Sequence, residues 1–358
     1  MWLFSYQYEY DHIYFKSGYS DDYMYEKFAA KLSVNSDLDD LLFYSKSHQD
    51  SGISMAHNSI GYINLVTLFH KISNTFFEYN TLIPRIFNVF ISAVIGYLIY
   101  RFLNAHNISS VQSKFFGFIF IAMPPVSFVS SFVFRDIIIA FLIFLLFIIN
   151  YRKYNFALFK IFIFVFSLLI IFYTFYYRQL TAITLTILYI LIHIYNFRSR
   201  FIRNGTIVIF IFSLPLFILN SHFLEYLYNY MIHYTMLRSG HGSVTSSIWE
   251  VPFPYLVPVR MLFGFFSPYP GLSMTFYNLA NTLNLILMLI CSFYFIKGTI
   301  LCLKSYKFIL LPLFYFAFFI PFALISGAPR HTVYFLPFFM IIVSLGLNYK
   351  KILYSKNA

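Results

Sequence analysis

Residues Ile161–Tyr177 read IFIFVFSLLIIFYTFYY, a run of apolar and aromatic side chains without a single Asp, Glu, Lys or Arg. Three further stretches share this property: Phe115–Phe134, Met261–Ile296 and Phe308–Pro329. A helix needs about 20 residues to cross the hydrocarbon core of a membrane, so several of these runs are long enough to span it. Inside lipid they must be helical, because no water is present to satisfy an open backbone.

The composition points the same way. Apolar residues make up 60% of the chain and charged residues 11%, and the mean hydropathy is +0.71. Soluble domains usually carry about 25% charged residues. We therefore predict an all-α, polytopic integral membrane protein with about nine transmembrane helices. They are expected at residues 86–103, 115–134, 137–151, 159–177, 180–197, 205–221, 275–296, 308–327 and 332–349, with kinks or breaks at Pro124-Pro125 and Pro321.

The N-terminal segment, residues 1–80, has a different composition, because it holds ten of the thirteen acidic residues. We expect three parts: this polar extracytoplasmic segment, a helical membrane domain over 81–349, and a cytoplasmic tail over 350–358. Translocation of an acidic segment requires a preceding span. We therefore expect a tenth span upstream, or Met1–Tyr10 as the remnant of one.

Orientation follows from the basic residues, which gather on alternate connections and belong in the cytoplasm by the positive-inside rule. Because membrane topology already accounts for basic residues in these short loops, the net charge of +12 does not indicate a nucleic-acid partner, and none is expected. The long connection 222–274 then lies outside. The fourteen cytoplasmic residues are Arg101, Lys114, Arg152, Lys153, Lys160, Arg198, Arg200, Arg203, Lys297, Lys304, Lys307, Lys350, Lys351 and Lys356.

Beyond the acidic segment, the basic residues on the outer side are six arginines and no lysine. Arginine binds phosphate bidentately and keeps its charge when partly desolvated. Snorkelling or ion pairing, such as Arg135 with Asp136 or Arg85 with Glu78, is the alternative for any one of them. We expect Arg135, Arg178 and Arg330, each in a short turn, to bind a diphosphate. The others are Arg85, Arg238 and Arg260, of which Arg238 and Arg260 lie in the long loop and could close over the substrate.

Candidate catalytic groups are fewer. Asp21 and Asp22 could supply a general base, or could simply cap a helix over residues 23–32. His241, within a Gly-Ser loop, could act as a base on a mobile lid. Glu250 and His331 are weaker candidates. The proline-rich tracts 251–258 and 266–271 predict irregular backbone lining a cavity. Neither a metal-ligand spacing nor a nucleotide-binding glycine loop is evident, so no metal, nucleotide or other cofactor is expected.

Short motifs resemble those of Wzy-type O-antigen or capsule repeat-unit polymerases, which are broadly similar to GT-C membrane glycosyltransferases. The motifs are Ser20–Tyr25 with His57–Tyr62 and Pro84–Asn88, Met123–Asp136, Phe263–Pro270, and Gly327–His331 with Pro337. The resemblance implies inverting glycosyl transfer between undecaprenyl-diphosphate-linked oligosaccharides at the periplasmic face of a bacterial inner membrane. The family's diphosphate-binding arginines would be Arg135, Arg178, Arg260 and Arg330, and its outer-loop acid Asp21 or Asp22.

Two alternatives stay open. A GT-C transferase would use a polyprenyl-phosphate sugar and often a divalent metal at an outer carboxylate. A flippase of the same lipid would be expected to show paired repeats and charges at mid-membrane. A chain-length regulator protein and membrane lipid are the other partners that the resemblance implies.

Overall fold

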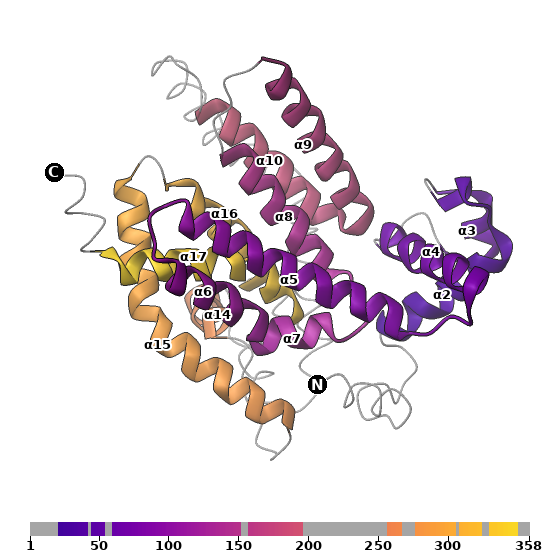
Figure 1. The fold of residues 1–358 in the computed structure, drawn as a ribbon, viewed down its shortest axis with the longest axis horizontal. Helices are drawn as coiled ribbons and strands as arrows, with labels where there is room; N and C mark the ends of the chain where they lie inside the picture. The colour runs from indigo at the N-terminus through magenta and orange to yellow at the C-terminus, as the bar shows by residue number, and fades with distance from the viewer. Residues whose placement is uncertain are drawn as a thin grey trace. The chain divides into compact units, whose positions relative to one another are not determined.

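The computed structural model describes residues 21–41, 44–53, 59–151, 157–195, 256–266, 276–305, 308–323 and 329–349. Every regular element among them is a helix, which confirms the all-α prediction for this part of the chain (Figure 1). The chain divides into two compact units, Met1–Ile183 and Thr184–Ala358. Each unit has its own core and is described by itself.

The first unit begins with a small group of helices: α2 (Asp21–Asn35), the short turn η1 (Asp39–Leu41), α3 (Lys46–Asp50) and α4 (Ile60–Phe76). Helices α2 and α4 run parallel, because Tyr25 meets Ser59 near their starts and Lys71 meets Ser33 near their ends. The predicted helix over 23–32 is confirmed and is longer at both ends. The sequence did not predict α4, whose buried face carries Asn64, Thr67 and His70 among its apolar residues.

Five helices follow: α5 (Leu82–Asn104), α6 (Ser110–Ala122), α7 (Pro124–Ser130), α8 (Asp136–Tyr151) and α9 (Ala157–Tyr177). Helices α5 and α6 cross closely at Gly96 and Gly117, where an added Cβ would come within 2.7 and 2.5 Å of the opposite carbonyl oxygen. The predicted kink at Pro124 is confirmed, since α6 and α7 meet at an angle of 57°.

With the bent pair α6 and α7 taken as one segment, these helices alternate in direction. His106, two residues after α5, has its Nε2 2.9 Å from the hydroxyl oxygen of Tyr151, the last residue of α8, so the C-terminal ends of α5 and α8 lie together. At the other end, Asp136 at the start of α8 meets Arg178, which follows α9. The alternation that the positive-inside argument required is therefore present in this unit. Which end faces the cytoplasm stays a prediction.

The second unit contains most of α10 (Gln179–Tyr195), then α14 (Leu256–Phe266), α15 (Phe276–Lys304), α16 (Leu310–Pro321), the turn η3 (Pro329–Tyr334) and α17 (Leu336–Leu347). Aromatic rings fill its core, with Phe295 5.1 Å from Phe339 and 4.7 Å from Tyr315. The expectation of irregular backbone over the proline-rich tract 251–258 was wrong in part. Residues 256–258 of the proline-rich tract form the first turn of α14, where Pro258 is tolerated because first-turn amides need no helical acceptor.

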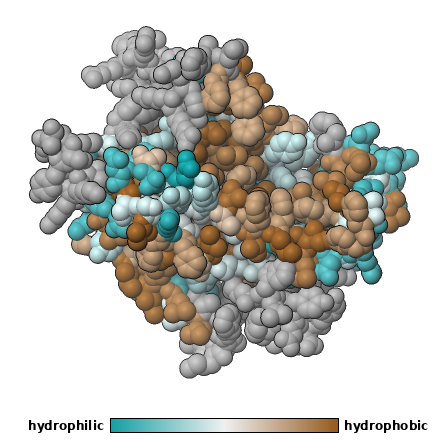
Figure 2. Space-filling model, in the orientation of Figure 1, coloured by the Kyte–Doolittle hydropathy of each residue, from teal (hydrophilic) through white to brown (hydrophobic). Residues whose placement is uncertain are grey.

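Three described helices are long and apolar enough to cross a membrane: Leu82–Asn104, Phe159–Tyr177 and Asn281–Lys304. The bent pair α6 and α7 adds a fourth if it is one span, and four shorter apolar helices accompany them. Figure 2 shows hydrophobic side chains over α5 and α15 and hydrophilic ones over the N-terminal helices. The fold is that of a membrane-embedded helical protein. The count of nine spans is not confirmed by the described residues, and the expected helix 205–221 lies outside them.

Candidate arginine site

Three of the six predicted outer arginines lie at one end of the first unit. Arg85 is in the first turn of α5, Arg135 immediately precedes α8, and Arg178 joins α9 to α10. The three arginines lie at the ends of different helices, and all three side chains are largely shielded from solvent. Arg85 is fully buried, Arg135 is 6% exposed and the Arg178 side chain is 19% exposed. Burying a guanidinium is costly unless it is paired and hydrogen-bonded, so each position requires a specific local structure.

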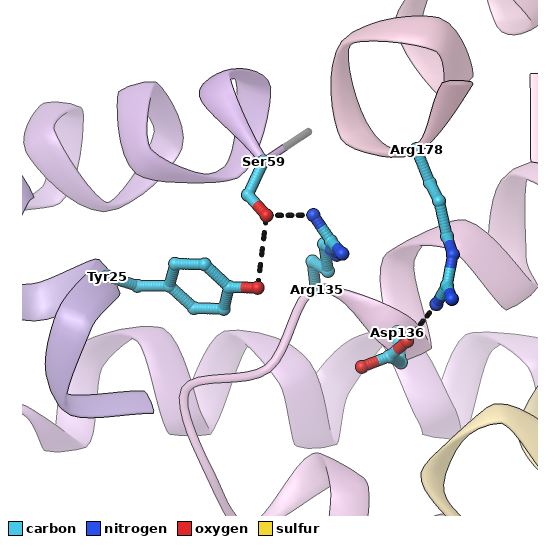
Figure 3. Close-up of polar contacts among 5 residues, drawn as sticks. All are labelled: Tyr25, Ser59, Arg135, Asp136 and Arg178. Atoms are coloured by element: carbon cyan, nitrogen blue, oxygen red, sulfur yellow. Dashed lines mark hydrogen bonds and ion pairs between the residues drawn. The ribbon is translucent and has the colours of Figure 1, made fainter. Parts of the chain in front are cut away.

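Asp136 supplies the negative charge. Its Oδ1 lies 3.5 Å from a guanidinium nitrogen of Arg178, and its side chain is 3% exposed (Figure 3). As the first residue of α8 it also stands at the positive end of that helix dipole. Asp136 is the one buried carboxylate among the side chains that the structure describes. Sequence analysis had considered its neighbour Arg135 as a partner, whereas this ion pair reaches across to the end of another helix.

Arg135 contacts the N-terminal helices. Its guanidinium donates to Ser59 Oγ at the start of α4, and Ser59 Oγ donates to the Tyr25 hydroxyl of α2 at 3.1 Å. The Arg135 guanidinium also lies 6.0 Å from the centre of the Tyr25 ring. Figure 3 shows this chain of contacts beside the Asp136–Arg178 pair. Tyr25 and Ser59 of the N-terminal segment therefore form part of the arginine site.

Tyrosine rings pack beside these contacts. Tyr62 of α4 meets Tyr25 edge-on at 5.3 Å and lies 6.4 Å from Tyr177, the residue before Arg178. Helices α4 and α9 approach closely here, because a Cβ on Gly61 would come within 3.0 Å of Tyr176 Cβ. A larger residue at position 61 would separate the helix that carries Ser59 from the end of α9.

Arg85 is held differently. Its Nε donates to Thr81 Oγ1 at 3.3 Å, and one terminal nitrogen lies 3.5 Å from the Ser131 carbonyl oxygen. Its guanidinium carbon is 5.6 Å from the Phe132 ring centre. The suggested partner Glu78 is exposed. Arg85 thus contacts the turn that leads to Arg135.

No protein-family model, curated protein or solved structure matches the chain. The resemblance to repeat-unit polymerases therefore remains an expectation from short motifs. The chemistry of the site has to be argued from its own side chains.

For the other predicted site residues, the structure describes only the backbone or lies outside their segment, except at His331. Asp21 and Asp22 are the first two residues of α2, one turn before Tyr25, although their side chains are not described. The segment that contains Arg238 and His241 lies outside the described ranges, as does Glu250. In the second unit, Arg260 lies in α14 and Arg330 in η3, and the structure describes neither side chain. His331 is buried and stacked on Tyr334, with ring centres 5.6 Å apart.

Sequence reasoning selected Arg135 and Arg178, but it assigned no role to Ser59 or Tyr25, which lie within the motifs His57–Tyr62 and Ser20–Tyr25. One tyrosine among 32 gives no signal, and a serine gives none without its helix. Asp136 could have been found, since an acidic residue opening an apolar run is unusual. Within the described residues, no group of three or more His, Cys, Asp or Glu could hold a metal ion. The described part of the site therefore consists of three arginines, one carboxylate and the hydroxyl groups of Ser59 and Tyr25.

Proposed function

We propose that this protein is a polymerase that joins polyprenyl-diphosphate-linked oligosaccharide repeat units at the periplasmic face of a bacterial inner membrane, in O-antigen or capsule biosynthesis. One observation carries the proposal. Arg135 and Arg178 were selected because the positive-inside rule disfavours arginine on the outer side, and they lie on either side of Asp136, the one carboxylate that is buried among the described side chains.

The charges support a diphosphate. Arg85, Arg135 and Arg178 contribute three positive charges and Asp136 contributes one negative charge, which leaves a net charge of +2 among these four side chains. A diphosphate that links a lipid to a sugar carries two negative charges. A buried cationic site would attract such a headgroup strongly, because screening is weak away from water.

During the proposed reaction, the negative charge on the lipid diphosphate increases. The bond between the sugar anomeric carbon and the lipid diphosphate breaks, and a hydroxyl of the incoming unit forms the new glycosidic bond on the opposite face. The hydroxyl proton passes to a base, for which Asp21, Asp22 and His241 are the predicted candidates. The departing diphosphate gains negative charge, and prepositioned arginines stabilise that charge as it develops.

Gene deletion followed by a glycan-length gel tests the proposal. We expect collapse of the ladder to a single repeat unit, with chains restored by the wild-type gene. Arg135→Ala, Arg178→Ala and Arg330→Ala should each fail to restore long chains at normal protein level. Arg178→Lys should restore them poorly, because a point charge cannot replace a bidentate fork. Normal ladders in all three alanine variants would exclude the diphosphate site.

The same gel separates the alternatives. Loss of all glycan on deletion would favour an earlier GT-C transferase or a flippase. Purified protein then distinguishes those two: a GT-C transferase would consume a polyprenyl-phosphate sugar, often with loss of activity in a chelator, whereas a flippase would only move the lipid-linked glycan.

A further inference from the structure

The turn that carries Arg135 is non-helical backbone enclosed by the helices of the first unit. Residues 131–135 connect α7 to α8, and Ser131, Val133 and Phe134 are buried. Buried carbonyl oxygens that lack helical partners must find donors elsewhere, because an unsatisfied polar group is costly. In a membrane-embedded protein, such backbone is tolerated only where neighbouring protein satisfies it.

Asn88 of α5 supplies those donors. Its side-chain nitrogen lies 2.9 Å from the Phe132 carbonyl oxygen and 3.0 Å from that of Phe134, and 3.2 Å from the Tyr62 hydroxyl. Two carbonyl acceptors fix the orientation of the amide, because only the nitrogen side can donate. Asn88 is fully buried, and its Oδ1 has no hydrogen-bond partner in the described structure. The amide thus serves the turn rather than its own helix.

Arg85 lies one helical turn before Asn88, on the same face of α5. It reaches the first carbonyl of the same turn, that of Ser131, at 3.5 Å. Together the two α5 side chains bind three carbonyls within the four residues before Arg135.

From this geometry we infer that Arg85 and Asn88 are positioning residues, which hold the turn 131–134 so that Arg135 points its guanidinium into the arginine site. The inference rests on the proposed function for its catalytic consequence. The contact itself does not depend on that function. Arg85 therefore has a positioning role through Arg135, in addition to the positive charge that it contributes to the site.

Hydrogen exchange on the purified full-length protein tests the contact. In Asn88→Ala, amides of residues 131–139 should exchange at least about tenfold faster, while those of α9 keep their rates. Ser92→Ala is the matched control, because Ser92 is buried one turn further along α5 and its hydroxyl donates to the Val89 carbonyl oxygen of its own helix. Asn88→Ser keeps one donor and should fall in between; it decides the test if Asn88→Ala does not fold. Equal exchange in the Asn88 and Ser92 variants would overturn the inference.

Glycan length in cells tests the consequence. At matched protein level, Asn88→Ala should shorten the chains, and Asn88→Ala combined with Arg135→Ala should be no worse than Arg135→Ala alone. Independent, multiplicative losses would overturn the positioning role. Normal chains in Asn88→Ala beside defective chains in Arg135→Ala would overturn it as well. Normal chains in Arg135→Ala, Arg178→Ala and Arg330→Ala alike would instead exclude the proposed diphosphate site, while faster exchange in Asn88→Ala would still support the contact with the turn.

Discussion

Asp136 and Arg178 form an ion pair at 3.5 Å between the start of α8 and the end of α9. Because α8 and α9 run in opposite directions, the pair closes one end of this helix hairpin. Because Asp136 directly follows Arg135 in the sequence, the ion pair also brings Arg178 close to Arg135. A single carboxylate thereby links the positions of two arginines that come from different turns.

Asp136→Asn should destabilise the protein by about 1–3 kcal/mol, since it leaves a partly buried guanidinium without its countercharge. The expected observation is a lower Tm in thermal unfolding of the detergent-solubilised protein. Adding Arg178→Gln to Asp136→Asn should cost less than the sum of the two single changes, because both charges are then removed. An unchanged Tm in the single variants, or strict additivity in the double variant, would show that the pair contributes nothing to stability.

A second prediction concerns Lys71, whose ammonium donates to the carbonyl oxygens of Ser33, at 3.0 Å, and of Ser36, at the end of α2. A cation at a helix C-terminus satisfies free carbonyls and complements the helix dipole. Lys71→Met should therefore destabilise the N-terminal helices by about 0.5–2 kcal/mol. The readout is faster hydrogen exchange in α2. Lys31→Met, on the exposed face of α2, should leave that exchange unchanged.

The sequence was sufficient to predict α5 and α9, because long uncharged apolar runs have few alternatives to a membrane helix. It was insufficient for α4, whose interior face is partly polar, so that hydropathy does not distinguish it from a loop. Only the fold shows that this helix places Ser59 against Arg135.

The sequence could predict which arginines belong to the candidate site, but not which side chains they contact. Arginine on the outer side departs from the positive-inside rule, and this departure is visible in one sequence, so Arg135 and Arg178 could be selected. Which carboxylate meets which arginine depends on helix register, and the sequence neighbour of Asp136 was the natural but incomplete choice. The role of Asn88 could not be read at all, because it depends on carbonyl groups, which every residue has.

His70 of α4, which lies outside the candidate spans, predicts a pH dependence of stability. It is buried, stacked on Tyr79 with ring centres 3.3 Å apart, and its Nε2 has no hydrogen-bond partner in the described structure. Burial lowers the pKa of His70 from 6.5 to about 4. Between these values the unfolded chain binds a proton that the folded chain excludes, so stability should fall as the pH drops from 6.5 to 4, by at most about 3 kcal/mol.

His70→Phe keeps a ring against Tyr79 and removes the titrating group, so unfolding measured across this pH range should lose that part of its slope. Tyr79→Phe is the matched control. It keeps the stack but loses the hydroxyl bond to Glu26, which is 3.1 Å long. It should lower stability by about 1 kcal/mol at every pH and leave the slope unchanged. The same slope in His70→Phe as in the wild type would contradict the assignment.

The predicted orientation can be tested with two cysteines at opposite ends of α5. Glu78 precedes this helix and Ala105 follows it, and both are exposed. In a background with Cys291→Ala and Cys302→Ala, an impermeant thiol reagent added from the periplasmic side should label Glu78→Cys. Ala105→Cys should react only after the inner membrane is opened, because the basic residue Arg101 in the last turn of α5 marks the cytoplasmic end. The reverse labelling would place the arginine site in the cytoplasm, and the proposal of a polymerase acting at the periplasmic face would then be wrong.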